Sequence, residues 1–242
     1  AHGWIMMKDG KMSKSKGNVV YPETLINRYG LDATKYFLLK ELQYGQDGIF
    51  SPEGFIERYN TELCNDLGNL LNRTIGMMNK YYGGVIPQNV GHKNEQDAEL
   101  EEFVISKVHS VEENIDSIHI SNALTELWSI ISRSNKYIDE TMPWALAKSE
   151  DENDKEKLES VMYHLAENLR IVAVLLQPFM KETANKMFEQ LGINDESLKG
   201  WDSISSYGKI DKETKVIEKG EPLFMRLDIE EETNYIKEAM NG

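Results

Sequence analysis

The sequence predicts a mainly helical protein: an antiparallel helical bundle preceded by a short strand–loop–helix segment. Apolar residues recur at steps of three and four over long stretches, which is the spacing of one face of an α-helix. Proline and glycine residues separate these stretches and leave short connections. Helices of that length with short connections pack antiparallel around a shared core.

The first part of the chain predicts the strand and loop. Residues 4–7 (Trp-Ile-Met-Met) have the composition of a short strand, and Asp9-Gly10 is typical of a hairpin turn. Residues 11–18 (Lys-Met-Ser-Lys-Ser-Lys-Gly-Asn) form a basic loop that contains glycine. The strand is therefore followed by a positively charged loop.

Two short helices are expected after this loop. Pro22 fits the first position of a helix that Gly30 ends, because proline needs no hydrogen-bond partner there. Asp32 has the residue type of an N-terminal cap, so we expect a second helix from Asp32 to about Tyr44.

A long amphipathic helix begins next. Ser51 and Pro52 fit its cap and first position, and Gly83-Gly84 with Pro87 end it. Its predicted buried stripe is Phe55, Tyr59, Leu63, Leu67, Leu71, Ile75, Met78 and Tyr82.

Further periodic stretches predict the rest of the bundle, at residues 95–116, 121–140 and 158–191. Proline breaks the chain at Pro143 and again at Pro178. The acidic residues 149–157 fit either a loop or the solvated start of a helix. Beyond them, turn residues and alternating charge dominate until a short helix expected at 230–240, with 220–224 extended.

Composition excludes several classes of protein. The net charge is −14, and residues 85–160 carry seven basic against seventeen acidic side chains. Because nonspecific nucleic-acid binding depends on neutralising phosphates, we expect any such contact to be local and directed at bases, and no binding to DNA. The longest apolar run, residues 171–176, is too short for a membrane span.

Cysteine usage is also informative. Cys64 is the single cysteine, which excludes an internal disulfide and a cysteine-cluster zinc site. Together with the absence of a basic-then-apolar N-terminal pattern, this predicts a cytoplasmic protein that binds no metal of its own.

The basic loop has the chemistry of an anion site. Lys11 and Lys14 are compact cations suited to phosphate, and glycine lets backbone amides approach an anion closely. The hydroxyls of Ser13 and Ser15 add donors. A solvated basic loop or a targeting patch is the alternative interpretation.

Two features of the bundle suggest nucleic-acid recognition. Asn69 and Arg73 are four residues apart and share one helical face, roughly opposite the predicted stripe. An amide and a guanidinium there can bond to base edges, although an ordinary solvated pair would look the same. Trp144 follows Pro143 at a helix junction, where an exposed ring would stack a base and a buried ring would belong to the core.

The string Lys-Met-Ser-Lys-Ser at residues 11–15, continued by Gly17-Asn18-Val19-Val20 and Pro22, resembles the nucleotide loop of class I aminoacyl-tRNA synthetases. Within that class, the chain resembles the bacterial methionyl-tRNA synthetase family from residue 1 to about 191, and again at 221–228. The matching stretches are His2-Gly3-Trp4, Asp32-Ala33-Thr34, Tyr36-Phe37-Leu38-Leu39, Asp47-Gly48-Ile49-Phe50-Ser51, Asn65-Asp66-Leu67-Gly68-Asn69-Leu70, Arg73 and Met142-Pro143-Trp144-Ala145-Leu146-Ala147-Lys148.

The resemblance implies a ligase that activates methionine with ATP and Mg²⁺ and transfers it to methionine tRNA. It implies that Lys11 and Lys14 stabilise triphosphate charge as pyrophosphate leaves, within an ATP loop of Lys11, Met12, Ser13, Lys14 and Ser15. It further implies that Asn69, Arg73 and Trp144 recognise the CAU anticodon. A single-stranded loop with unstacked bases is the usual target of sequence-specific RNA recognition.

The chain departs from this family by lacking the first half of the nucleotide fold, its His-Ile-Gly-His-type motif and its zinc-binding insertion. We therefore expect a fragment of a longer protein that is inactive alone. We expect residues 1–50 to end a catalytic domain, 51–192 to form the anticodon-binding bundle and 193–242 a C-terminal extension. A helical protein-interaction scaffold and the equivalent part of another class I synthetase are the alternatives.

Overall fold

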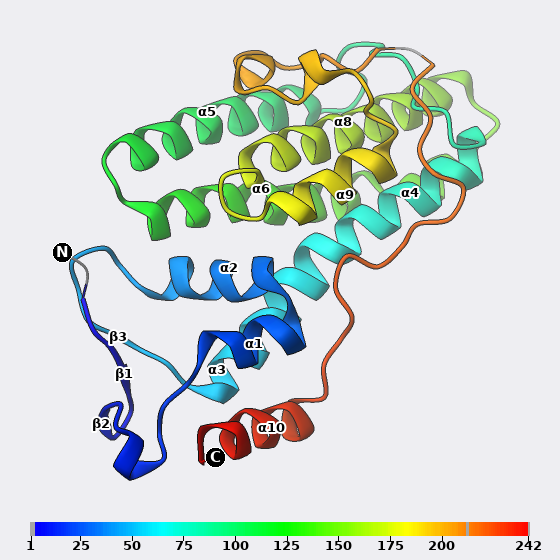
Figure 1. Cartoon of the computed structure of the whole chain (residues 1–242). Coiled ribbons are helices and arrows are strands. Elements are labelled where there is room, and N and C mark those ends of the chain that lie inside the picture. Colours follow the sequence, from blue (N-terminus) through cyan, green and yellow to red (C-terminus); the bar gives the residue numbers. More distant parts are fainter. Residues whose placement is uncertain (1–2, 212, 242) are drawn as a thin grey trace.

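A computed structural model describes residues 3–211 and 213–241 of the chain, so the His2 position of the expected motif lies outside the description. A bundle of long helices lies above a smaller part that holds the sheet and the first helices (Figure 1). The C-terminus returns to this smaller part (Figure 1). The predicted mainly helical fold is confirmed.

The expected strand and hairpin form a small three-stranded sheet of order β2-β1-β3. β1 (Ile5–Met7) pairs antiparallel with β2 (Gly10–Lys11) and parallel with β3 (Gly48–Ile49). Gly10 has a φ of 112°, which a side chain would resist and glycine accepts. The basic loop follows β2 directly.

The two short helices are α1 (Pro22–Tyr29) and α2 (Leu31–Glu41). The predicted role of Asp32 is wrong, because Gly30 occupies the cap position. The Asp32 carboxylate instead accepts hydrogen bonds of 2.7 and 2.8 Å from the backbone N–H and the hydroxyl of Thr183. Asp32 therefore ties the N-terminal part to the bundle, and α2 ends three residues earlier than expected.

The long helix is continuous but not uniform. It comprises α3 (Pro52–Arg58), a π-helical segment (Tyr59–Gly68) and α4 (Asn69–Tyr82). From residue 55 to residue 75 the predicted stripe advances by four residues at every step. A regular α-helix turns about 40° too far at each such step, or about 200° over five steps. The wider π segment, with i→i+5 bonds, absorbs this drift and keeps the stripe buried.

The other bundle helices are α5 (Asp97–Asp116), α6 (Ile120–Thr141), α8 (Glu152–Leu176) and α9 (Lys181–Leu191). The one-turn helix α7 (Pro143–Leu146) joins α6 to α8. The acidic stretch is a helix start: the Asp151 side chain accepts from the Asn153 N–H at 2.8 Å. α8 lies at the centre, since almost every residue from Leu158 to Leu176 is buried.

A buried ion pair lies within α8. Glu167 and Arg170 are fully buried, and their side chains meet at 2.7 and 2.9 Å. Arg170 also donates to the Leu198 carbonyl and the Ser203 hydroxyl, and Glu167 accepts from the N–H of Gly208. These bonds fix the segment after α9 against the bundle.

That segment then crosses the molecule to α10 (Ile229–Asn241), which packs against α3 and α1 (Figure 1). Glu232 accepts from Arg28 at 2.8 Å and from the Tyr29 hydroxyl at 2.7 Å. The predicted C-terminal helix is thus confirmed, whereas residues 220–224 join no strand.

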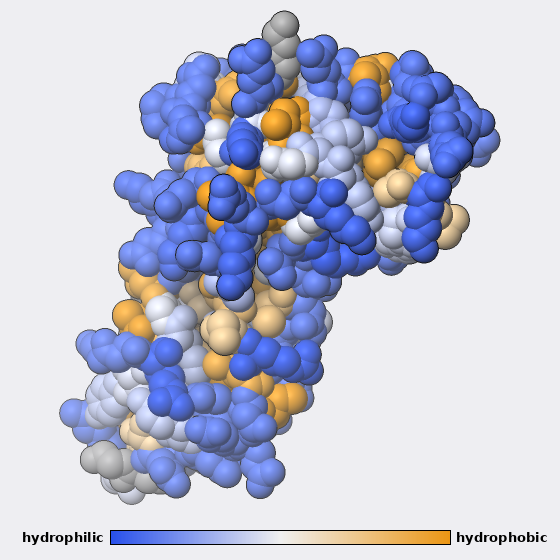
Figure 2. Space-filling view, turned by 90° about the vertical axis from the view of Figure 1, so that its right-hand side faces the viewer, coloured by the Kyte–Doolittle hydropathy of each residue, from blue (hydrophilic) through white to orange (hydrophobic). Residues whose placement is uncertain are grey.

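The surface agrees with the two-part arrangement. Figure 2 shows a broad, largely hydrophilic upper part and a narrower lower part where hydrophobic patches reach the surface. Among the described residues, no helix is both long and apolar enough to span a membrane.

Candidate nucleotide loop and nucleic-acid interface

The basic loop is organised by one buried side chain, Asn18. Its Oδ1 accepts from the Ser13 N–H at 2.7 Å, while its Nδ2 donates to the Asp9 carboxylate and the Lys11 carbonyl at 3.3 to 3.5 Å. Gly17 closes the turn with a φ of 64°. Asn18 therefore connects both ends of the loop and also hydrogen-bonds to the carboxylate of Asp9.

The lysines of the loop point into solvent. Lys11 and Lys14 are exposed, and no carboxylate of the described residues forms an ion pair with either. The Lys11 ammonium lies 5.0 Å from the Trp4 ring centroid. The Ser13 and Ser15 hydroxyls lie 2.8 Å apart, and Met12 packs against the core. Two exposed ammonium groups without a carboxylate partner among the described residues, beside two hydroxyls that bond to each other, fit a polyphosphate ligand.

Trp144 is exposed to solvent. Its relative accessibility is 42%, which excludes the core interpretation. Pro143 is buried beside it, and Met142 has a left-handed φ of 46° that turns the chain between α6 and α7. A buried proline and a fixed turn thus hold the indole outward on a rigid junction.

Asn69 and Arg73 lie on one face of α4, as predicted. Asn69 is exposed and Arg73 half-buried. The Arg73 guanidinium lies 3.6 Å from the carboxylate of Asp139, on α6. Asp139 lies in the last turn of α6, so this ion pair links Arg73 to the helix end that leads to Trp144. An incoming base edge would compete with Asp139 for the guanidinium.

Asn69 also lines a groove of about 410 Å³ between the long helix and the segment at Pro222–Phe224. Its walls are polar amides on one side and apolar side chains on the other. Burial raises the pKa of the Cys64 thiol in this groove, so the thiol is neutral near neutral pH and poorly nucleophilic. The groove residues are Cys64, Asn65, Gly68, Asn69, Asn72, Pro222, Leu223 and Phe224.

The predicted residues thus form two separate groups. The structure brings Asn69, Arg73 and Trp144 to the α4–α6–α7 region of the bundle, and leaves the lysine loop beside the small sheet (Figure 1). Asn18 and Asp139 are the contributing residues that sequence reasoning missed. Asn18 was visible as the last residue of the loop, but the partner of Arg73 depends on how two helices pack.

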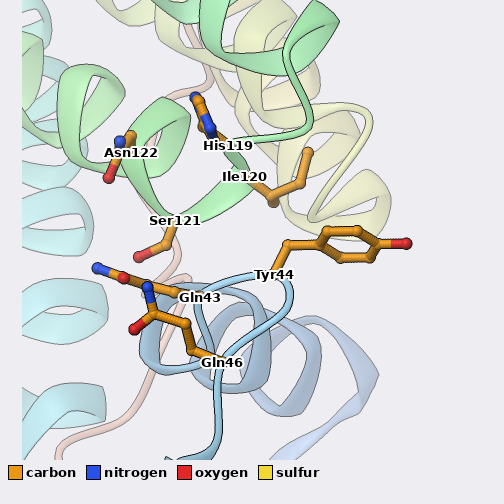
Figure 3. Close-up of a pocket in the computed structure, with 7 residues that line it drawn as sticks. All are labelled: Gln43, Tyr44, Gln46, His119, Ile120, Ser121 and Asn122. Carbon is orange, nitrogen blue, oxygen red and sulfur yellow. The ribbon is translucent and has the colours of Figure 1, made fainter. Parts of the chain in front are cut away.

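A third feature was not predicted. A cavity of about 220 Å³ lies where the loop after α2 meets the start of α6 (Figure 3). Its glutamine amides lie near Ser121, whose hydroxyl donates to the Lys40 carbonyl at 2.6 Å, and the Tyr44 ring points away (Figure 3). The cavity lies at the joint between the two parts of the molecule, and its lining combines amides and hydroxyls with His119 and Ile120.

Two sequence families match the chain. The family described as class I tRNA synthetases (M) matches residues 1–75. The family described as the anticodon-binding domain of methionyl-tRNA ligase matches residues 86–241.

Curated relatives and solved structures agree. The chain is 60% identical to the methionine–tRNA ligase of Bacillus subtilis and 55% identical to that of Lactococcus lactis, over its whole length. It spans 36% of the length of each of these ligases. Mycobacterium tuberculosis methionyl-tRNA synthetase bound by methionyl-adenylate superposes on 93% of the chain with a TM-score of 0.85 and 34% identity, over 43% of its own length. The chain therefore belongs to the methionyl-tRNA ligase family, whose anticodon-binding domain it contains.

Proposed function

We propose that the chain recognises the CAU anticodon of methionine tRNA through Asn69, Arg73 and Trp144. The observation that carries the proposal is the exposed indole of Trp144, five residues after Asp139, whose carboxylate pairs with Arg73. Trp144 stacks a splayed base, a contact worth about 1–3 kcal/mol. Arg73 and Asn69 bond to base edges. Such a small, base-directed surface suits a chain with a net charge of −14.

In the full-length ligase, ATP and methionine are substrates and the loop of Lys11, Met12, Ser13, Lys14 and Ser15 contacts the nucleotide. Lys11 and Lys14 stabilise the negative charge that develops on pyrophosphate as the methionine carboxylate displaces it from the α-phosphorus of ATP to form methionyl-adenylate. Their exposed, unpaired ammonium groups support this role. Mg²⁺ shares the charge of the triphosphate when it is bound, and no residue of the chain is assigned to it.

The proposed functions divide the chain into three consecutive parts. Residues 1–50 complete a catalytic domain, 51–192 form the anticodon-binding bundle, and 193–242 connect the bundle back to the first part. The chain acts in the cytoplasm within the complete ligase and is inactive as a ligase by itself, because the rest of the nucleotide fold lies in other parts of the relatives it matches.

Equilibrium binding of the chain to methionine tRNA tests the proposal, beside the same tRNA with one anticodon base changed. Both are measured at two salt concentrations, because the phosphate contribution depends on salt. We expect the CAU tRNA to bind more tightly, and the ratio between the two tRNAs to persist at the higher salt. Arg73→Ala should reduce that ratio, whereas Lys80→Ala, an exposed cation on the same helix, should leave it unchanged.

Equal binding of the two tRNAs would contradict the assignment of the three residues. If neither tRNA binds the chain, and if full-length ligases carrying Trp144→Ala or Arg73→Ala bind methionine tRNA as the wild-type ligase does, the protein-interaction scaffold is favoured.

A further inference from the structure

Away from both sites, two histidines and a glutamate converge at one end of the bundle. Glu101 lies on α5, His164 on α8, and His92 in the connection that precedes α5. One carboxylate oxygen of Glu101 lies 3.0 Å from Nε2 of His164, and the other lies 3.1 Å from Nε2 of His92. One ligand atom from each residue falls within 4.8 Å of the other two.

The protonation of His164 makes this arrangement unusual. Nδ1 of its fully buried ring lies 2.6 Å from the carbonyl oxygen of Ser160, so Nδ1 carries a hydrogen and donates it. In a neutral ring, Nε2 then points its lone pair at a carboxylate oxygen of Glu101, which is also an acceptor. A cation must lie between the two atoms, either a second proton on the ring or a metal ion.

We propose that His92, Glu101 and His164 bind a Zn²⁺-class divalent transition-metal ion, with water completing a tetrahedral site. Two histidines and a glutamate with one open position are an established zinc ligand set. Ligand atoms about 2.0–2.1 Å from a tetrahedral ion lie about 3.3 Å apart. The separations of 3.0 and 3.1 Å, each to a different oxygen of Glu101, need a few tenths of an ångström of opening. The three ligand atoms lie within 4.8 Å of one another, so the widest separation must shorten around a single ion, which the exposed His92 side chain can allow.

The residues around the three ligands favour binding of a metal ion. The bond from His164 Nδ1 to a backbone carbonyl is the usual outer-shell contact that orients a histidine ligand. Asp97, fully buried one helical turn before Glu101, adds negative charge nearby but is already committed, because it accepts from Tyr137 and Ser160. The His92 side chain is 49% exposed, which leaves an entry path from solvent.

The position of His92 is also fixed. The residue before it, Gly91, accepts a 3.0 Å hydrogen bond from Ser160, and the N–H of the residue after it, Lys93, donates to Asp97 at 2.8 Å. The site is therefore assembled from three separate elements before any ion binds. A bound ion would fasten the connection between α4 and α5 to the bundle, a structural role independent of tRNA recognition and ATP chemistry.

This site departs from the expectation that the chain binds no metal. That expectation followed from the single cysteine, and a site of two histidines and a glutamate uses none. The spacing of 9 and 63 residues between the ligands carries no recognisable motif, so the sequence alone could not indicate it.

The test is metal binding by the chain after treatment with EDTA, using Zn²⁺ for calorimetry and Co²⁺ for visible absorption. We expect one Zn²⁺ per chain, a higher melting temperature with Zn²⁺, and the strong absorption of four-coordinate Co²⁺. His92→Ala should weaken Zn²⁺ binding by more than the 10–100-fold that follows loss of an outer-shell partner. Because His92 is exposed, this variant should keep the wild-type circular dichroism.

Two further variants make the result decisive. Glu101→Gln keeps the shape of the site but should lose the Zn²⁺-dependent rise in melting temperature, whereas His109→Ala, an exposed histidine on α5, should bind as the wild type does. The proposal would be overturned if the wild type bound no Zn²⁺, or if wild type and His92→Ala bound Zn²⁺ equally. Either result would favour a cluster in which a proton, and no metal ion, lies between His164 and Glu101.

Discussion

The lysine loop and the Trp144 surface differ in how the fold holds them. The loop at residues 11–18 is exposed along most of its length and depends on the single buried side chain of Asn18. Trp144 stands on a turn fixed by buried Pro143, between two helices of the central bundle. The loop can move against a substrate during a reaction, whereas the Trp144 surface is preorganised.

The difference suggests separate kinds of failure. Substitutions in the buried interior of the bundle should lower the stability of the fold. Substitutions at Trp144 should weaken tRNA binding, and those in the lysine loop should lower the rate of methionine activation. The following experiments test that separation in order of decreasing expected effect.

Removing one partner of the buried Glu167–Arg170 ion pair should give the largest loss of stability. Glu167→Ala leaves the Arg170 guanidinium buried without its carboxylate, which costs about 3–5 kcal/mol of unfolding free energy. Urea denaturation followed by circular dichroism measures it. Glu196→Ala, which removes an exposed pair with Lys199, is the matched control and should change stability by about 1 kcal/mol or less. Equal losses of unfolding free energy in both variants would contradict a stabilising role for the buried ion pair.

Lys14→Ala should affect rate without affecting folding. In the full-length ligase, loss of one positive group that closes onto the developing charge should lower the rate of methionine-dependent ATP–pyrophosphate exchange about 10²–10³-fold. Lys219→Ala, an exposed lysine outside the loop, should leave the rate unchanged. An unchanged rate in Lys14→Ala would remove this lysine from the proposed chemistry.

Trp144→Ala should affect binding alone. Loss of one stacking contact should weaken CAU tRNA binding by about 1–3 kcal/mol while the melting temperature stays close to wild type. Tyr44→Ala removes an exposed aromatic side chain at the other joint of the molecule and should leave tRNA binding unchanged. If Trp144→Ala unfolds the protein, the indole is structural and the assignment is wrong.

Asn18→Ala should loosen the loop locally. The variant loses the bond to the Ser13 N–H, a contribution of about 1 kcal/mol. Hydrogen exchange at Ser13 and its neighbours should accelerate while exchange in α8 stays slow. Uniform acceleration in both regions would show that the loop and the bundle open together.

The smallest effect should come from pH at the C-terminal helix. The hydrogen bond from Arg28, with a second from Tyr29, holds the pKa of the Glu232 carboxyl below its ordinary value. The stabilisation is therefore fully present at neutral pH and is lost as the pH falls through that lowered pKa. The melting temperatures of wild type and Glu232→Gln should differ at pH 7 and converge in acid. Glu230→Gln, on an exposed residue of the same helix turn, should match wild type throughout.

Local patterns predicted the helices well and their connections poorly. Period, proline and glycine located α1, α5, α6 and the long helix over residues 52–82 to within about two residues, because each helix carries its own signals. Asp32 was misassigned because an aspartate near a helix start resembles a cap, and its partner Thr183 lies 151 residues away. The constant four-residue step from Phe55 to Ile75 did contain the signal of the π segment, since no straight α-helix can satisfy it.

The candidate site shows the same limit. Motif and helical spacing located Lys11, Lys14, Asn69, Arg73 and Trp144 in the sequence. Burial decided between the core and the surface for Trp144, and packing supplied Asp139 as the partner of Arg73. Both facts depend on contacts between elements, which composition and periodicity do not encode.

The docking of α10 onto α1 also has a consequence for folding during synthesis. Arg28 and Glu232 are separated by 204 residues, so the ribosome releases the partner of Arg28 only after the whole bundle between them has been made. Long-range closure of this kind slows folding, since the intervening chain must be ordered first. The α1–α3 part therefore stays incomplete while the bundle helices are translated, and α10 completes it only after they have emerged.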